Sequence, residues 1–159
     1  MRNPASVIIA VCASLTFFGS LAYACSCVQA TPGEAVKNSD AVFVGLLQNS
    51  RHSPNPVRGV LGGGTIDATF KVIRAIKGVR NDQVVVVKTP DLGPFCGIEE
   101  WLKEKPGAEW VIYAGLPKDA SINTTVPGTT YVTSRCDRSA QTRAAEEDLK
   151  YFDSLKVNR

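Results

Sequence analysis

The sequence predicts an all-β domain with flanking helices, in which five strands close into a small barrel. Five segments carry the alternation or the Val-rich and aromatic composition of strands, and they follow one another in meandering order. No helix long enough for a crossover separates any two of them, which disfavours a parallel sheet. A short helical pattern precedes the first strand, and an amphipathic one follows the last.

The short N-terminal helix is predicted over residues 32–38. Thr31 and Glu34 have the spacing of a capping box, in which each residue satisfies a backbone N–H at the start of the helix. Pro32 occupies the first helical position, where its missing N–H costs nothing.

The first strand is predicted over residues 40–48, which are rich in Val and Phe and apolar on both faces. Gly45 in the middle of this segment indicates a bulge or a tight bend. Residues 49–64 are dense in Ser, Asn, Pro and Gly and show no periodicity, so they predict a long exposed loop. His52 in this loop is expected to be a solvated side chain.

The second strand starts at Thr65, where apolar and polar residues begin to alternate. Residues 82–89 predict its antiparallel partner, because turn residues separate the two segments. Trp101 and Trp110 are expected in the core. A short helical piece is predicted over 99–103, and two further strands are predicted over 109–114 and 129–134. An amphipathic C-terminal helix follows over 139–155. The apolar face of that helix consists of Ala145, Leu149, Phe152 and Leu155.

The first 24 residues have the pattern of a cleavable secretory signal. Arg2 precedes an uncharged apolar run over 5–21, and Ala22-Tyr23-Ala24 supplies the small residues of a cleavage site before Cys25. The apolar run is shorter than the roughly 20 residues of a comfortable membrane span. We therefore expect a secreted or periplasmic mature chain over 25–159, without a membrane span.

A lipoprotein signal is the alternative interpretation, with Cys25 lipidated and anchored. Such signals carry a small residue two positions before the cysteine, and bulky Tyr23 fits this pattern poorly. We therefore favour cleavage between Ala24 and Cys25 with the α-amine left free.

Length and charge limit what the mature chain can be. Its 135 residues (159 minus 24) suit a single domain, expected to be a monomer. Removal of Arg2 leaves 17 basic side chains against 15 acidic ones, which gives no electrostatic case for nucleic acid. His52 is the only histidine, so no His-rich metal site or Ser/His pair is expected. We expect neither an enzyme nor a protein with its own cofactor or metal.

Four cysteines remain after cleavage, at positions 25, 27, 96 and 136, and two disulfides are the default in an oxidising compartment. Three pairings are possible, but a bridge between Cys25 and Cys27 would close a very small strained ring. Each of these two should therefore reach a distant partner. Each closure would stabilise the fold by about 3 to 5 kcal/mol on chain-entropy arguments. A redox role is disfavoured, because reactive pairs usually have a Cys-x-x-Cys arrangement at a helix N-terminus.

A signal cut immediately before Cys25-Ser26-Cys27, a short helix and a strand of the form at 41–45 resemble the inhibitory domain of the tissue inhibitors of metalloproteinases. The chain is also similar to the wider netrin-like modules that share that fold. The similarity continues in four further segments: 70–78, Cys96-Gly97, 110–115 and Cys136-Asp137. The third bridge and the second domain of the animal inhibitors are absent, as in the shorter single-domain relatives of bacterial type.

The resemblance implies a five-stranded OB-type barrel with disulfides between Cys25 and Cys96 and between Cys27 and Cys136. It also implies inhibition of zinc metalloproteases, whose catalytic zinc keeps an open position occupied by water. The free amine and the carbonyl oxygen of Cys25 would chelate this zinc, and Ser26 would point into the protease pocket. Flanking contacts would come from the 49–64 loop and from four residues near the cysteines: Val28, Pro94, Phe95 and Gly97.

Two other interpretations stay open. The chain could be a non-inhibitory netrin-like module that binds another extracytoplasmic protein in the cell envelope or extracellular space. The bridges could also simply tie an N-terminal strand to a small barrel. OB-type barrels often bind oligonucleotides, but export and the near-neutral charge argue against that ligand here.

Overall fold

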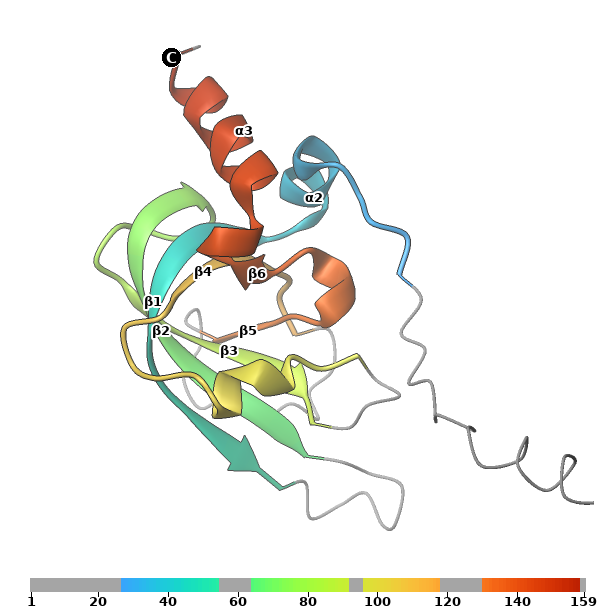
Figure 1. The fold of residues 1–159 in the computed structure, drawn as a ribbon, viewed down its shortest axis with the longest axis vertical. Helices are drawn as coiled ribbons and strands as arrows, with labels where there is room; N and C mark the ends of the chain where they lie inside the picture. The colour runs from blue at the N-terminus through green and yellow to red at the C-terminus, as the bar shows by residue number, and fades with distance from the viewer. Residues whose placement is uncertain (1–26, 55–63, 92–95, 118–129, 158–159) are drawn as a thin grey trace, which may run out of the picture.

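The computed structural model describes residues 27–54, 64–91, 96–117 and 130–157 (Figure 1). These residues form a six-stranded mixed sheet with the strand order β5-β3-β2-β1-β4-β6 and two α-helices. The strands are β1 (Ala41–Ser53), β2 (Thr65–Lys77), β3 (Val84–Pro90), β4 (Glu109–Ala114), β5 (Thr130–Val132) and β6 (Ala140–Gln141). The α-helices are α2 (Pro32–Asn38) and α3 (Glu146–Val157), and short 3-10 turns cover Glu99–Leu102, Arg135–Asp137 and Thr142–Ala144. The predicted β-rich fold with a helix near each end is confirmed.

The predicted meandering order is wrong in two places: β4 pairs with β1 rather than with β3, and β5 pairs with β3, in parallel. The expectation assumed that a parallel neighbour needs a helical crossover. Here the chain forms β4 beside β1, two strands away from β3 in the row, and then returns to the free edge of β3 as β5. A strand's own composition does not encode which neighbour it takes.

One isolated β-bridge joins strands that lie near opposite edges of the sheet. Gly115, directly after β4, and Val132 at the end of β5 form an antiparallel pair with two backbone hydrogen bonds of 2.9 Å each. The two strands at the ends of the row β5-β3-β2-β1-β4 are thus linked by this bridge, and directly after β5 the Thr133 hydroxyl donates to the Tyr113 carbonyl of β4 at 2.7 Å.

β1 is longer than predicted, and the first part of the loop expected over 49–64 is strand instead. Residues 49–53 belong to this strand and pair with 65–69 of β2. Residues 49–53 are polar because this end of the hairpin is largely exposed, so their composition gives no strand signal. Backbone pairing with β2 keeps them in the strand. Residues 55–63 of the predicted loop lie outside the described residues. The register between β1 and β2 shifts at Gly45, which confirms the predicted irregularity there.

A core of interlocking aromatic side chains lies between the strands and the 99–102 turn. Phe43, Phe70, Trp101 and Trp110 form a chain of edge-to-face contacts with ring centroids 6.2, 5.3 and 5.9 Å apart. Trp101 is fully buried and Trp110 is nearly so, which confirms both as core residues.

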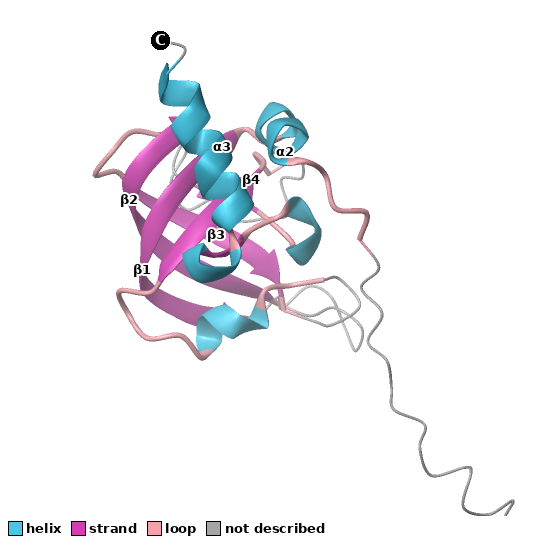
Figure 2. Ribbon diagram, turned by 45° about the horizontal axis from the view of Figure 1, so that its top comes forward, coloured by secondary structure: helices cyan, strands magenta, loops and turns pink. Residues whose placement is uncertain are grey.

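A second core lies between the outer face of the sheet and the two helices. Figure 2 shows α2 and α3 side by side near one end of the strands. The predicted apolar face of the C-terminal helix is confirmed, since Ala145, Leu149, Phe152 and Leu155 all belong to this second core. The helix itself begins at Glu146 rather than near 139, because Ala140–Gln141 pairs with the edge of β4 as β6. Within the described residues, no helix combines the length and apolarity that a bilayer crossing requires.

Candidate functional site

The structure describes part of the predicted site. Cys27, Val28, Cys96, Gly97 and Cys136 lie within the described residues. The predictions for Ala24, Cys25, Ser26, Pro94 and Phe95 concern residues outside the described ranges and stay predictions.

Cys27 and Cys136 form a disulfide across 109 residues of sequence, with their Cα atoms 5.3 Å apart. This confirms one of the two predicted bridges. Cys96 is also disulfide-bonded, and its predicted pairing with Cys25 remains a prediction. The sulfur atoms of Cys27, Cys96 and Cys136 all lie within 4.8 Å of one another. The Cys27–Cys136 bridge and the sulfur atom of Cys96 therefore lie next to each other.

Cys136 is held by a capped turn directly after β5. The side chain of Asp137 accepts a 2.7 Å hydrogen bond from the Ser134 backbone N–H, and the Ser134 hydroxyl oxygen accepts one from the Cys136 N–H at 3.3 Å. This reciprocal capping box fixes the 135–137 turn. The bridge to Cys27 thus starts from an ordered base.

The segment around Cys96 is tied to the same turn. Arg135 donates its backbone N–H to the Cys96 carbonyl at 2.6 Å, and its side chain pairs with Glu100 at 2.9 Å. Cys96 has a left-handed φ of +55°, a conformation that ordinary residues adopt at some cost. Gly97 is buried, and a Cβ there would lie 1.7 Å from the Pro90 carbonyl oxygen, so glycine is required.

The N-terminal segment, residues 27–30, leaves one large apolar side chain in solvent. Val28 is 97% exposed, whereas Cys27 and Ala30 are half-buried. The bridge at Cys27 and a 2.8 Å hydrogen bond from Arg138 Nη1 to the Ala30 carbonyl attach this segment to the domain, and the side chain of Ala30 packs against the second core. The following residue, Thr31, caps α2, whose predicted capping box with Glu34 is confirmed.

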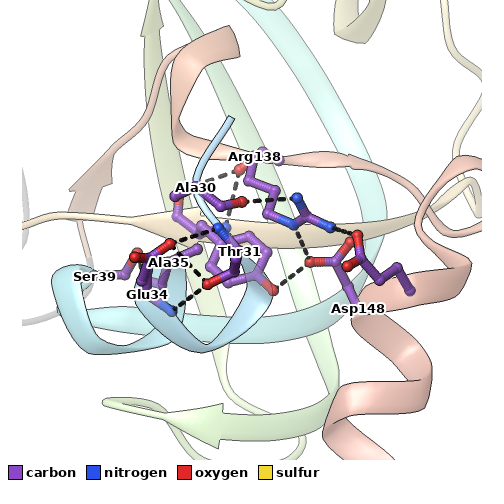
Figure 3. A network of polar contacts seen from close by, with 10 residues as sticks. Ala30, Thr31, Glu34, Ala35, Ser39, Arg138 and Asp148 are labelled. Carbon is purple, nitrogen blue, oxygen red and sulfur yellow. Dashed lines mark hydrogen bonds and ion pairs between the residues drawn. The ribbon is translucent and has the colours of Figure 1, made fainter. Parts of the chain in front are cut away.

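Arg138 stands at the centre of a polar network that the sequence did not indicate (Figure 3). Besides Ala30 it donates from Nε to Asp148 at 2.6 Å, and it also contacts Glu147. Tyr113 donates its hydroxyl to the same Asp148 oxygen at 2.6 Å. The hydrogen bond to Asp148 raises the pKa of Arg138, and burial followed by the hydrogen bond to Asp148 raises the pKa of Tyr113.

A cavity of about 250 Å³ lies beside the turn that holds Cys136, because Ser134 and Asp137 line it together with Thr65 and Lys88. Lys88 pairs with Asp67 at 3.1 Å, and both residues are buried, at 8% and 5% exposure. The sequence predicts strands at both positions but carries no signal that pairs Asp67 with Lys88. The strand register between β2 and β3 puts the two residues opposite each other.

His52 lies in β1 rather than in a loop, and it contacts the carboxylate of Asp91. Its side chain is 48% exposed, as expected for a solvated histidine.

No protein-family model matches the chain, and no curated protein matches it.

Proposed function

We propose that the mature chain is a secreted or periplasmic inhibitor of zinc metalloproteases, which chelates the catalytic zinc through the α-amine and carbonyl oxygen of Cys25. The observation that carries the proposal is the convergence of Cys27, Cys96 and Cys136 within 4.8 Å beside the exposed Val28. A terminus bridged at this point would be rigid before binding. Rigidity matters because ordering a flexible segment subtracts from the free energy of binding.

The proposed architecture is a five-stranded OB-type barrel formed by β5-β3-β2-β1-β4. The bridge between Gly115 and Val132 supports it, since it brings the two end strands of that row together. In this arrangement β6 and α3 are additions outside the barrel. The turn with Cys136 and the segment with Cys96 follow β5 and β3, so they would share one end of the barrel.

The proposed chemistry needs only backbone atoms of Cys25. A free α-amine and the carbonyl oxygen of the same residue close a five-membered ring on a metal. They would replace the water on the open position of a catalytic zinc with three protein ligands. Ser26 would then enter the pocket next to the zinc, and the exposed Val28 would contact the adjoining protease surface.

The test adds one alanine before Cys25. This change moves the amine away from the carbonyl oxygen of Cys25 while both disulfides can still form. We expect the chain starting at Cys25 to inhibit at least one catalytic domain in a panel of zinc metalloproteases. The extended chain should be weaker by on the order of a hundredfold, because the chelate is lost.

The controls are the thermal midpoint and the free-thiol count of both chains, which should agree. Equal potency of the two chains would show that chelation is not the mechanism. Absence of inhibition by either chain, together with binding to an envelope or extracellular protein, would instead support the non-inhibitory interaction module.

A further inference from the structure

We propose that Arg138 is a positioning residue, which fixes the N-terminal segment (residues 27–30) by linking it to helix α3 and to the sheet. The contacts between Arg138 and the N-terminal segment lie within the described residues. The consequence of this role for inhibition rests on the function proposed above.

The guanidinium of Arg138 uses three different nitrogen atoms for three acceptors. Nη1 donates to the Ala30 carbonyl at 2.8 Å, Nε donates to Asp148 at 2.6 Å, and Nη2 contacts Glu147 (Figure 3). A planar guanidinium can satisfy such a set at once, whereas a lysine ammonium is a single point of charge on a flexible stem.

The contacts to Ala30 and Asp148 matter more than the contact to Glu147, because both are partly buried. The side chain of Arg138 is 13% exposed and that of Asp148 is 5% exposed, so this pair is little screened. Glu147 is 70% exposed, and ion pairs at that exposure contribute little. Asp148 is in turn held by the hydroxyl of Tyr113 on β4.

The position of Arg138 in the chain makes it a second clamp next to the disulfide. It lies two residues after Cys136, so one short segment holds Cys27 through a covalent bond and Ala30 through a hydrogen bond. Arg138 itself has a left-handed φ of +70°, a conformation that persists where surrounding contacts determine it. Two attachment points three residues apart restrict both the place and the direction of the segment.

Helix α3 therefore braces the N-terminal segment, although the two lie at opposite ends of the described chain. Asp148 belongs to the first turn of α3 and orients Arg138, which reaches Ala30. The first turn of α3, through Asp148, therefore supports this segment as well as the core.

The experiment measures amide hydrogen exchange over residues 28–31 in the full mature chain, in Arg138→Ala and in Arg138→Lys. Both variants should exchange about tenfold faster at Thr31, because its N–H and the Ala30 carbonyl belong to one peptide group. When that carbonyl loses its charged donor, the 2.9 Å hydrogen bond from the Thr31 N–H to Glu34 opens more often. Arg138→Lys keeps the charge beside Asp148 and is expected to retain more of the thermal stability. It keeps the test valid if Arg138→Ala does not fold.

Arg74→Gln is the matched control. Arg74 also attaches α3, through Asp153 at 2.9 Å and the Phe152 ring at 5.7 Å, but both of these partners lie on the helix. This variant should leave exchange over residues 28–31 within about twofold of the parent chain, which corresponds to less than one hydrogen bond.

The outcomes separate this inference from the proposed function. Faster exchange in both Arg138 variants but not in Arg74→Gln supports the positioning role, even if the parent chain inhibits no protease. Where the parent chain does inhibit, the same variants should also weaken inhibition about tenfold. Unchanged exchange over residues 28–31 in Arg138→Lys, or equal acceleration in Arg74→Gln, would overturn the inference.

Discussion

The carboxylate of Asp148 joins three parts of the chain at the scale of single residues. One of its oxygens accepts hydrogen bonds from Arg138 and from the Tyr113 hydroxyl, both at 2.6 Å. Asp148 is 4% exposed, and a carboxylate at that depth is tolerated only when it is paired and hydrogen-bonded. The two donors supply both conditions.

Tyr113 gives a prediction at this scale. Burial and the neighbouring Asp148 carboxylate raise its pKa, so the hydroxyl stays neutral in the folded protein at a pH where an unfolded tyrosine, with a pKa of about 10, ionises. This contribution to stability is complete below pH 10 and declines as the pH rises further. The ultraviolet absorbance of the Tyr113 tyrosinate should therefore appear together with unfolding.

The measurement compares alkaline titrations of the parent chain and of Tyr113→Phe, with far-ultraviolet circular dichroism recorded in parallel. The substitution should cost about 1 kcal/mol at neutral pH, because Asp148 loses one of its two donors. A tyrosinate signal near pH 10 that disappears in Tyr113→Phe while the fold stays intact would contradict the buried hydrogen bond.

Helix α2 illustrates what the sequence can predict at the scale of an element. Its observed range, Pro32–Asn38, coincides with the predicted one, because every signal for it is local. Thr31 accepts from the Glu34 N–H, and Glu34 accepts from the Thr31 N–H at 2.9 Å. β4 was also predicted with its observed bounds, since six residues of strand composition end at a glycine.

Other element boundaries depend on partners that lie far away in the sequence. Residues 49–53 extend β1 because β2 offers a pairing edge, although their composition is that of a loop. β6 interrupts the predicted C-terminal helix because the edge of β4 is free to pair with Ala140–Gln141. No local signal distinguishes these polar strand residues from loop residues.

The capping box of α2 gives a prediction on acid stability. Hydrogen bonds from the Thr31 backbone and then from its hydroxyl lower the pKa of Glu34. A lowered pKa stabilises the folded state above the ordinary value of 4.5, and this stabilisation is lost as the pH falls through the folded-state pKa. The thermal midpoint of Glu34→Gln should therefore lie below that of the parent chain at pH 7 and approach it at pH 3.

Thr31→Ala serves as the comparison for this helix. It removes the cap that receives the Glu34 N–H, which should cost about 1 kcal/mol at either pH. It also removes the hydroxyl that helps lower the pKa of Glu34, so its total cost should be somewhat larger at pH 7 than at pH 3. A gap between Glu34→Gln and the parent chain that is as large at pH 3 as at pH 7 would refute the pH assignment.

At the scale of the whole molecule, the candidate site is assembled from segments that are distant in the sequence. The bridge between Cys27 and Cys136 spans 109 residues, and the hydrogen bond between Arg138 and Ala30 spans 108. The bridge between Cys27 and Cys136 could be predicted, because cysteines are few and the resemblance described above implied this pair. The arginine could not, since nothing in the local sequence separates Arg138 from exposed basic residues such as Arg143.

The central claim is that the mature chain presents a free α-amine at Cys25, held by two disulfides. Intact-mass spectrometry of the protein purified from its native compartment tests this claim most directly. We predict the mass of residues 25–159 less four hydrogen atoms, since four cysteines would form two bridges. An additional acyl mass on Cys25, a different first residue, or two thiols that remain free would contradict it, because the amine would then be blocked, displaced or unsupported.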